Sequence, residues 1–529
     1  MPAAPQDPLI EVRAIRWERI QWWLEARIPA GMAVDPAGVH LANPEQGLVM
    51  APTHADHDGD RLAIRFNVMT GPGRRPLAAG RWAIDVPAAA APGVTIGGAA
   101  DIGRFTTPTG AYTMTPFHDP ATRTLGIDVT VEPIRRAVDD QPAVVRLRLG
   151  LRKSITRLRR AAFRTVVSVS GRFRRPGKTR IQFTSRLISD MSGNIQVVYD
   201  RMLERGLDRD LDIVTMLKPG LTERWSFPDR FRLARAIASA DVIVLDDSFP
   251  PINWVKLRPD VRLIQLWHAA GAFKTVGYSR FGTPDPNVRV HPPYSAAIVS
   301  SAFDVPFYAE AFGIPEAQVI PTGIPRMDRF FDADARAPGL AAARAAYPAT
   351  DGHLTILFAP TYRGDTIPEA TYDFERLDYA ALHALCVERD AVVIIKMHPF
   401  VREPLAIQAA FRDRLLDGSV APIDVNDLLF AVDLLVTDYS SIVFEYSTLR
   451  RPMLFYAYDL DDYANSRDFY VPFESFVPGR IVRTFPELLD AIRGEDYQVE
   501  KVADFATRHF AHLDSGSTDR VIDQLIVPR

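Results

Sequence analysis

The order of apolar and polar residues divides the 529-residue chain into three regions. In residues 1–145, apolar and polar residues alternate in short segments, for example at Leu62, Ile64, Phe66 and Val68, and clusters of Gly, Pro and Asp separate these segments. Neighbouring side chains of a β-strand point to opposite faces, so this period of two predicts a small antiparallel β domain. No group of residues in this region suggests catalysis.

Residues 146–186 contain many basic residues and no acidic one. The basic residues are Arg146, Arg148, Arg152, Lys153, Arg157, Arg159, Arg160, Arg164, Arg172, Arg174, Arg175, Lys178, Arg180 and Arg186. Leu151, Ile155, Leu158 and Ala162 recur at helical spacing, so we expect an amphipathic helix with arginines on its other faces. Such a helix suits an anionic membrane surface. A solvated linker helix that packs on a neighbouring domain explains the pattern equally well.

From about residue 180 onwards, continuous apolar segments alternate with helical patterns. The expected strands are RIQF, LDIVTML, DVIVLDD, VRLIQLW and AAIVSS and, after a break near residues 333–352, LTILFAP, AVVIIKM, DLLVTD and MLFYAY. Apolar strands that alternate with helices are typical of buried parallel sheets. We therefore predict an α/β fold with two Rossmann-like domains facing each other across a cleft. The predicted boundaries are 1–145, 146–179, 180–335 and 336–529.

Composition adds few constraints. A net charge of -3 gives no general attraction to nucleic acid, so no nucleic-acid partner is expected. The single cysteine, Cys386, excludes internal disulfides, fits a reducing compartment and lies in a helical pattern as a small core residue. The N-terminus lacks the pattern of a signal peptide, and no apolar run approaches the ~18 residues that a membrane span needs. We therefore expect a cytoplasmic protein unless it binds a membrane surface.

Polar residues gather where the predicted strands of the α/β region end. Ligands of parallel α/β sheets bind beyond the carboxyl ends of the strands. Each residue alone is explained as a turn residue, a cap or a surface ion pair, but five groups at five strand ends indicate one cleft that binds an anion. The groups are His268 with Gly271 and Lys274; Thr322, Gly323 and Arg326; Pro360, Thr361, Tyr362 and Arg363; Lys396, Met397 and His398; and Ser440 with Ser441.

The paired serines, Ser440 and Ser441, stand between an apolar strand and a helical pattern at Ile442, Val443 and Tyr446. The first N–H groups of a helix lack partners within the helix and attract anions, and short hydroxyl side chains leave room for a phosphate. Ordinary N-capping needs only one hydroxyl, so the pair favours phosphate binding.

Three motifs that bind nucleotides or metals are missing from the sequence. There is no GxxxxGK[ST] loop, no GxGxxG after a strand and no regularly spaced His/Asp/Glu cluster. We therefore expect basic side chains and helix N-termini to bind a diphosphate, without a metal ion or another cofactor.

Several motifs together resemble the CDP-glycerol glycerophosphotransferase family, which includes teichoic-acid primases and polymerases. They are QLWHAAGAFKTVG, TGIPRMD, ILFAPTYR, KMHP, NDLLFAVDLLVTDYSSIVFEY, RPMLFYAYDLDDY and VPGRIV, within roughly residues 180–500. The resemblance implies a GT-B fold with an acceptor side in residues 180–335 and a donor side in residues 336–529. It implies CDP-glycerol or CDP-ribitol as donor and a lipid-linked or polymeric acceptor at the inner face of the membrane. The β domain lies outside it, and its role stays open.

The resemblance also implies site residues. His268 and His398 match two functionally important histidines of the family. The matching donor-binding positions are Ala269, Ala270, Gly271, Ala272, Arg326, Pro360, Thr361, Lys396, Met397, Ser440, Ser441 and Glu445. The family loop usually reads His-Gly-Thr-Pro-Leu, so the alanines after His268 put the acceptor or polyol preference in doubt. Lys396 replaces an arginine of many members and loses the bidentate fork.

We expect an acceptor hydroxyl to attack the β-phosphorus of the CDP-linked donor and to release CMP. His268 is the first candidate for the general base and His398 the second, because imidazole accepts protons near neutral pH. One alternative is a GT-B glycosyltransferase or epimerase that uses a UDP-sugar, and another is a non-catalytic scaffold that binds polymer. The polyol, the choice between primase and polymerase, and the oligomeric state stay open.

Overall fold

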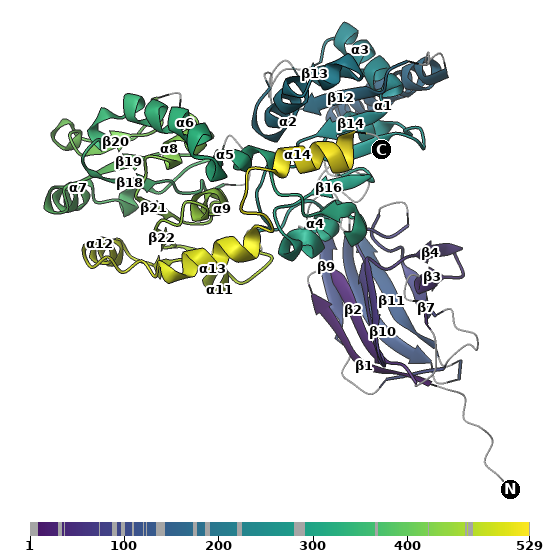
Figure 1. Cartoon of the computed structure of the whole chain (residues 1–529). Helices are drawn as coiled ribbons and strands as arrows, with labels where there is room; N and C mark the ends of the chain where they lie inside the picture. Colours follow the sequence, from purple (N-terminus) through teal and green to yellow (C-terminus); the bar gives the residue numbers. More distant parts are fainter. Residues whose placement is uncertain are drawn as a thin grey trace.

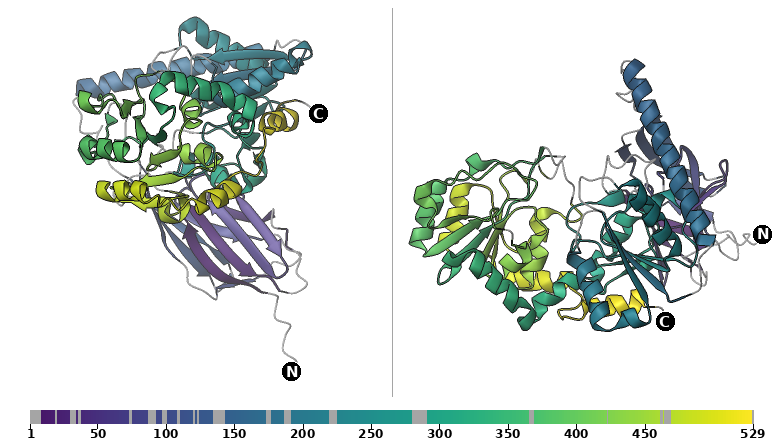
Figure 2. Two further views of the ribbon diagram at one scale, coloured as in Figure 1. Left: turned by 60° about the vertical axis from the view of Figure 1, so that its left-hand side comes forward. Right: turned by 90° about the horizontal axis from the view of Figure 1, so that it is seen from above.

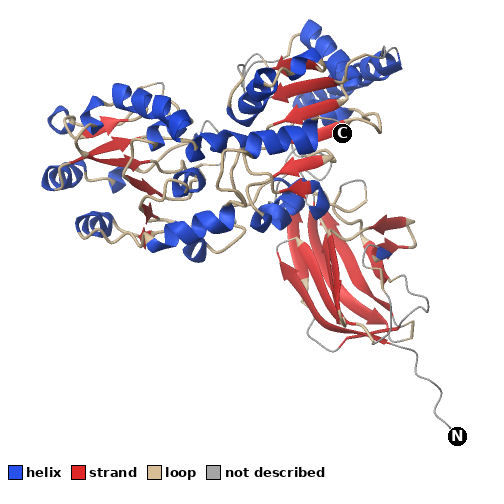
Figure 3. Ribbon diagram, in the orientation of Figure 1, coloured by secondary structure: helices blue, strands red, loops and turns tan. Residues whose placement is uncertain are grey.

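The computed structural model describes the chain except for residues 1–8, 19, 30–33, 36–37, 73–74, 87–92, 97–100, 108–109, 120, 123, 134–142, 173–176, 186–190, 219–224, 280–290, 365–368, 422, 461–462, 464–468 and 528–529. A β domain precedes two α/β domains, each with a parallel sheet between helices (Figures 1 and 3). This arrangement confirms the predicted fold class. We call the domain around strands β12–β17 the acceptor-side domain and the domain around strands β18–β23 the donor-side domain, after the roles that the family resemblance implies.

The β domain consists of two sheets. One has the order β5-β6-β2-β1-β8 and the other β4-β3-β7-β11-β10-β9. Trp22 and Phe66 of the first sheet and Leu41 and Trp82 of the second are fully buried in one core, which explains the alternation in the sequence. The strands are β1 (Leu9–Glu18), β2 (Gln21–Arg27), β3 (His40–Asn43), β4 (Leu48–Met50), β5 (His54–Asp58), β6 (Arg61–Asn67), β7 (Gly80–Asp85), β8 (Gly93–Ile96), β9 (Gly103–Thr107), β10 (Gly110–Asp119) and β11 (Thr124–Pro133).

The β domain is attached to the acceptor-side domain by polar contacts. Arg65 of β6 forms an ion pair with Glu316, and His54 Nδ1 lies 3.2 Å from the same carboxylate. The amide of Asn67 donates a hydrogen bond to the carbonyl of Glu310, at 3.4 Å. Glu310 belongs to α4 (Val305–Phe312), so the β domain is fixed to the acceptor-side domain by a helix and the segment that follows it.

A long helix, α1 (Ala143–Arg172), joins the β domain to the acceptor-side domain. Its last turns pack on α3 (Phe227–Ser239) and on Trp254 through Phe163 and Val167. The preceding turns extend beyond the body of the protein (Figure 2, right), and every side chain described from residue 154 to 160 is exposed.

The predicted apolar face of this helix does not pack on the protein. Leu151, Ile155 and Leu158 are 63%, 42% and 72% exposed, and Ala162 is exposed as well. The last turns of α1 pack as the linker interpretation predicts. The membrane-surface interpretation stays a prediction. Arg174, Arg175 and Arg186 lie outside the described residues, as do the side chains of Arg146, Arg148, Arg152 and Lys153.

The acceptor-side domain contains a six-stranded parallel sheet in the order β13-β12-β14-β15-β16-β17. Its strands are β12 (Arg180–Ser185), β13 (Asp212–Leu217), β14 (Val242–Leu245), β15 (Arg262–Gln265), β16 (Ala296–Ile298) and β17 (Val319–Ile320). Besides α3 and α4 it has α2 (Gly193–Glu204) and the short 3-10 helices η3 (Pro250–Trp254) and η7 (Pro325–Met327). Arg180 of the basic segment lies in β12 and pairs with Asp212, so it belongs to this sheet and not to the basic surface.

The donor-side domain repeats this plan in the order β20-β19-β18-β21-β22-β23. Its strands are β18 (Leu354–Phe358), β19 (Ala391–Ile395), β20 (Leu415–Asp417), β21 (Leu434–Thr437), β22 (Met453–Tyr456) and β23 (Arg480–Val482). Its helices are α5 (Asp328–Phe331), α6 (Ala333–Ala346), α7 (Tyr379–Glu388), α8 (Val425–Leu429), α9 (Ile442–Ser447), α11 (Phe473–Phe476), α12 (Phe485–Arg493) and α13 (Glu500–His509).

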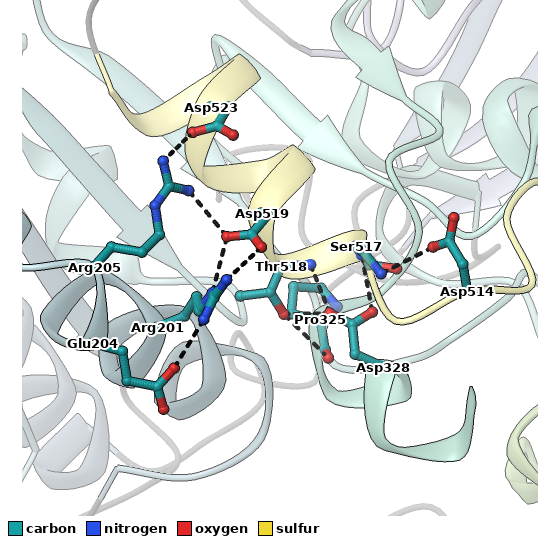
Figure 4. Close-up of polar contacts among 11 residues, drawn as sticks. Arg201, Glu204, Arg205, Pro325, Asp328, Asp514, Ser517, Thr518, Asp519 and Asp523 are labelled. Carbon is teal, nitrogen blue, oxygen red and sulfur yellow. Dashed lines mark hydrogen bonds and ion pairs between the residues drawn. The ribbon is translucent and has the colours of Figure 1, made fainter. Parts of the chain in front are cut away.

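The C-terminal segment crosses back to the acceptor-side domain. Asp519 of α14 (Ser517–Val521) accepts hydrogen bonds from Arg201 at 2.9 and 3.0 Å and from Arg205 at 3.0 Å, and Asp523 accepts one from Arg205 (Figure 4). The domain prediction placed this segment with the donor side. In the structure it joins both domains, because α13 packs on α9 of the donor side and α14 packs on α2 of the acceptor side.

Candidate active site

The loop after β15 carries His268 and begins with a strained residue. Trp267 has φ of 51°, a left-handed conformation that side chains with a Cβ rarely adopt. Its N–H donates to Gln265 Oε1 at 2.9 Å, and its carbonyl accepts from Asn194 Nδ2 at 2.7 Å. The buried Trp267 ring packs on Phe312, at 5.2 Å between centroids. His268 follows at once and is exposed, with its ring 4.2 Å from that of Trp267.

The rest of this loop is buried against the donor-side domain. A Cβ on Gly271 would lie 2.2 Å from the ring of Phe444 in α9, so only glycine allows this approach. The Gly271 carbonyl accepts from Tyr308 at 3.0 Å, and the Ala272 N–H donates to Asp304 at 3.0 Å. The family resemblance implies that Ala270, Gly271 and Ala272 bind the donor. In this structure all three are buried, and backbone hydrogen bonds of Gly271 and Ala272 hold the loop in place. Ala269 alone of the four small residues stays partly exposed.

Arg326 of η7 connects the two domains. Its guanidinium donates to the His268 carbonyl at 3.1 Å and forms an ion pair with Glu445 of α9. The side chains of Arg326 and Glu445 are only 15% and 6% exposed, and Glu445 Oε2 is buried without a hydrogen-bond partner among the described residues. Buried polar atoms without a partner are rare and often mark a ligand site. The structure thus brings together three predicted site residues, His268, Arg326 and Glu445.

The paired serines begin α9, next to this group. Ser441 makes no capping hydrogen bond with its side chain, and Ser440 Oγ is 3.4 Å from the N–H of Ile442. Both serines are partly exposed. Because α9 has only six residues, its dipole is small, and the hydroxyl groups and first N–H groups would make most of any contact with a phosphate.

Asp438 links the turn that contains Ser440 and Ser441, here called the serine turn, to the loop after β18. One of its oxygens accepts from the N–H groups of Thr361, at 2.7 Å, and Tyr439, at 2.6 Å. The other accepts from Arg363 at 3.0 Å, and Asp459 binds the same guanidinium at 2.6 and 2.8 Å. Burial opposes the charge of Arg363, but the two carboxylates outweigh it and raise the pKa of the guanidinium. The Thr361 hydroxyl is buried without a hydrogen-bond partner among the described residues, and the adjacent Pro360 is buried as well.

His398 packs against two aromatic side chains. Its ring is 4.8 Å from that of Tyr362 and 4.6 Å from that of Phe400. The Phe400 N–H donates to His398 Nδ1 at 3.2 Å, which leaves the proton of a neutral ring on Nε2. Burial, and secondly the charge of Lys274, lower the pKa of His398. Lys274, which ends the loop that begins at His268, therefore reaches the neighbourhood of His398.

Lys396 points towards the edge strand β20. Its ammonium donates to the carbonyl of Gly418 at 2.9 Å, and burial lowers its pKa while Asp424 and Asp417 oppose the shift. The buried Met397 is held by its N–H, which donates to Ser419 at 3.3 Å. Both residues follow β19 at the carboxyl edge of the donor-side sheet and contact the residues after β20.

Sequence reasoning did not find all residues that build this site. Asn194 stands next to Gly193 at the start of a helical pattern, where a cap is the simple interpretation. Asp459 lies in the motif RPMLFYAYDLDDY, but it was not singled out as a site residue. The left-handed φ of Trp267 has no sequence signal, because tryptophan has no preference for that conformation. The described residues contain no group of three or more His, Cys, Asp or Glu side chains that could hold a metal ion.

Comparison with known proteins defines the class. A family model described as CDP-Glycerol:Poly(glycerophosphate) glycerophosphotransferase matches residues 168–527. The chain therefore belongs to this family. The teichoic acid ribitol-phosphate polymerase TarK of Staphylococcus aureus is 46% identical over 348 residues, which cover 65% of this chain and 68% of TarK. TarL of the same organism, also a teichoic acid ribitol-phosphate polymerase, is 41% identical over 418 residues, or 78% of this chain and 74% of TarL.

A solved structure supports the fold. The structure of the wall teichoic acid polymerase TagF has a TM-score of 0.56 and 22% sequence identity, and the match covers 73% of this chain and 98% of that one. The chain is thus a member of a family of teichoic-acid transferases with the predicted α/β architecture. Among its described helices, none is long and apolar enough to cross a lipid bilayer.

Proposed function

We propose that this protein transfers ribitol phosphate from CDP-ribitol to a hydroxyl group of a lipid-linked or polymeric acceptor and releases CMP. The observation that supports it most is the position of the Arg326 guanidinium. It binds the backbone carbonyl of His268 and, across the domain boundary, the carboxylate of Glu445. Ribitol is preferred over the glycerol of the family description because TarK and TarL are both named for ribitol phosphate. TagF supports a CDP-linked donor, because a histidine-to-asparagine variant of it was soaked with CDPG.

In the proposed reaction, the acceptor oxygen attacks the phosphorus that carries the polyol. The new phosphorus–oxygen bond forms while the bond to the bridging oxygen of the diphosphate breaks, and CMP leaves with that oxygen. His268 takes the proton of the acceptor hydroxyl as general base. Because His268 is exposed and stands at the carboxyl edge of the acceptor-side sheet, an acceptor can approach it from solvent.

The donor-side groups would hold the diphosphate. The hydroxyl groups of Ser440, Ser441 and Thr361 and the N–H groups at the start of α9 are placed on two adjacent loops that Asp438 ties together. Lys274 and Lys396 would supply positive charge, and His398 would act as a neutral hydrogen-bond donor through Nε2. Arg326 is already paired with Glu445, so it would contact the donor only if that pair opens or is shared.

We also propose that α1 holds the protein on the anionic inner face of the cell membrane, where a lipid-linked acceptor would lie. The exposed Leu151, Ile155 and Leu158 can enter the lipid headgroup region, and the exposed Arg157 and Arg159 can contact anionic headgroups.

A panel of donors tests the proposed reaction. The purified protein is incubated with CDP-ribitol, CDP-glycerol or a UDP-sugar, each with a lipid-linked acceptor, and the released nucleotide and the product length are measured. We expect CMP from CDP-ribitol at a higher kcat/KM than from CDP-glycerol, and no UDP. Release of UDP would support the glycosyltransferase alternative, and binding of CDP-ribitol without turnover would support the scaffold.

A further inference from the structure

Asn194 lies beneath the His268 loop, and its side chain uses all its hydrogen-bonding groups there. It is 2% exposed in the first turn of α2. Its Nδ2 group donates to the carbonyls of Leu266, at 3.2 Å, and Trp267, at 2.7 Å. Its Oδ1 accepts from the backbone N–H of Arg326 at 3.1 Å. Because carbonyls only accept and an N–H only donates, these partners fix the orientation of the amide.

These hydrogen bonds belong to a closed network that includes the backbone of the proposed base, His268. Asn194 binds the main chain of Trp267, the residue after Trp267 is His268, and the His268 carbonyl accepts from the Arg326 guanidinium at 3.1 Å. The backbone of Arg326 then returns to Asn194. Any shift of the amide would therefore move His268 and Arg326 relative to each other.

The left-handed backbone conformation of Trp267 explains why this network needs strong hydrogen bonds. A non-glycine residue in the left-handed region costs of order 1–3 kcal/mol, and it persists only where its surroundings hold it. Here Gln265 binds the N–H of Trp267 and Asn194 binds its carbonyl, so both backbone groups are held by buried side chains. This conformation determines the direction in which the next residue, His268, leaves the loop.

The loop of Arg326 is fixed on its other side by the C-terminal helix. Asp328 accepts hydrogen bonds from the N–H groups of Ser517, at 3.0 Å, and Thr518, at 2.8 Å, and from the Thr518 hydroxyl at 2.6 Å (Figure 4). Arg326 therefore lies between two rigid supports, Asn194 in α2 and the start of α14.

We propose that Asn194 is a positioning residue of the transfer reaction, whose amide holds the loops of His268 and Arg326 in the arrangement that the reaction needs. This inference rests on the proposed function, in which His268 is the general base. Asn194 contacts neither donor nor acceptor, and acts through the two backbone segments that it binds.

The test uses Asn194→Asp and a matched control. A carboxylate keeps the shape and can still accept from Arg326 N–H, but it cannot donate to the carbonyls of Leu266 and Trp267. The control is Asn67→Asp, which changes an equally buried amide that contacts the Glu310 carbonyl at the edge of the β domain. We expect Asn194→Asp to lower kcat on the order of 10²-fold, since small misplacements of reacting groups have effects of this size. Asn67→Asp should lower the melting temperature and leave kcat unchanged.

A double-mutant cycle separates positioning from loss of stability. In the His268→Ala background, Asn194→Asp should cost much less in kcat than in the wild type, because the group that it positions is gone. An equal cost in both backgrounds, or a wild-type kcat for Asn194→Asp, would overturn the inference. If Asn194→Asp does not fold, Asn194→Ala, which adds no charge, takes its place in the same cycle. Wild-type transfer by His268→Ala alone would instead contradict the proposed function.

Discussion

The guanidinium of Arg326 in the acceptor-side domain pairs with the carboxylate of Glu445 in the donor-side domain. The two residues are 119 positions apart in the chain, and both side chains are largely buried. The pair joins the loop that carries His268 to the helix that begins at the paired serines. It therefore couples the proposed base to the proposed phosphate site.

Glu445→Gln should lower both stability and transfer. It leaves the Arg326 charge without its counter-ion, and breaking a buried ion pair in this way costs about 3–5 kcal/mol. The double variant Arg326→Gln/Glu445→Gln leaves no unpaired charge, so it should recover most of the free energy of unfolding but not the transfer rate. Chemical denaturation and CMP release measure the two quantities. Wild-type transfer by the double variant would show that the pair has only a structural role.

Arg363→Lys should raise the KM for the CDP-linked donor. The planar guanidinium binds Asp438 and Asp459 together, whereas an ammonium group cannot reproduce this geometry. Since Asp438 aligns Thr361 with the serine turn, we expect kcat/KM for the CDP-linked donor to fall on the order of 10²-fold. Arg258→Lys is the control. Arg258 binds Asp241 and the carbonyls of Ala238 and Ala240, which lie just before β14, at the amino end of the acceptor-side strands. An equal effect of both substitutions on the donor KM would contradict this role.

Asp246→Asn should stabilise the protein at neutral pH. Burial, and secondly the charge of Asp247, raise the pKa of Asp246 from 3.8 to about 6, and its Oδ1 atom has no hydrogen-bond partner among the described residues. In the unfolded chain the carboxyl loses its proton near pH 3.8, so the folded state is penalised increasingly from about pH 4 to about pH 6 and constantly above that. The penalty is at most roughly 3 kcal/mol.

The free energy of unfolding, measured from about pH 3 to about pH 8, tests this. The gain from Asp246→Asn should be full above about pH 6 and vanish below about pH 4. A gain that does not depend on pH would mean that ionisation of Asp246 is not its cause.

Replacement of Arg157, Arg159 and Arg164 by Gln should weaken binding to anionic vesicles by roughly a hundredfold, at about 1 kcal/mol for each basic residue near the surface. All three side chains are exposed. Arg160 is left unchanged because its guanidinium lies 5.3 Å from the centroid of the Trp254 ring and supports the packing of α1. Sedimentation with vesicles at low salt gives the affinity, and thermal unfolding controls for the fold. Equal sedimentation of variant and wild type would argue that α1 does not bind the membrane.

Local pattern was enough to predict most of the fold. The nine strands expected in the α/β region all form, because each lies in a mainly apolar stretch. The pattern did not indicate β20 and β23, which have three residues each. It also missed the return of α14, which depends on ion pairs such as that of Arg201 with Asp519, 318 positions apart.

The sequence predicted several residues of the site, but not the residues that hold them in place. His268 and Arg326 belong to polar groups that the sequence places at strand ends, Glu445 is implied by the family resemblance, and the three come together. Asn194, Asp459 and the conformation of Trp267 determine the geometry of that group, but their effect arises only from contacts between distant segments. Such contacts leave no periodic pattern in a single sequence.

The role of His268 as general base is tested by the rate of CMP release from CDP-ribitol, measured for wild type and for His268→Ala with the same lipid-linked acceptor. A general base contributes typically ~10²–10⁴-fold, so the variant should be slower by a factor in this range and should still bind CDP-ribitol. Equal rates for the two proteins would show that His268 is not the base, and no CMP from the wild type with any CDP-polyol would show that the protein is not a CDP-polyol transferase.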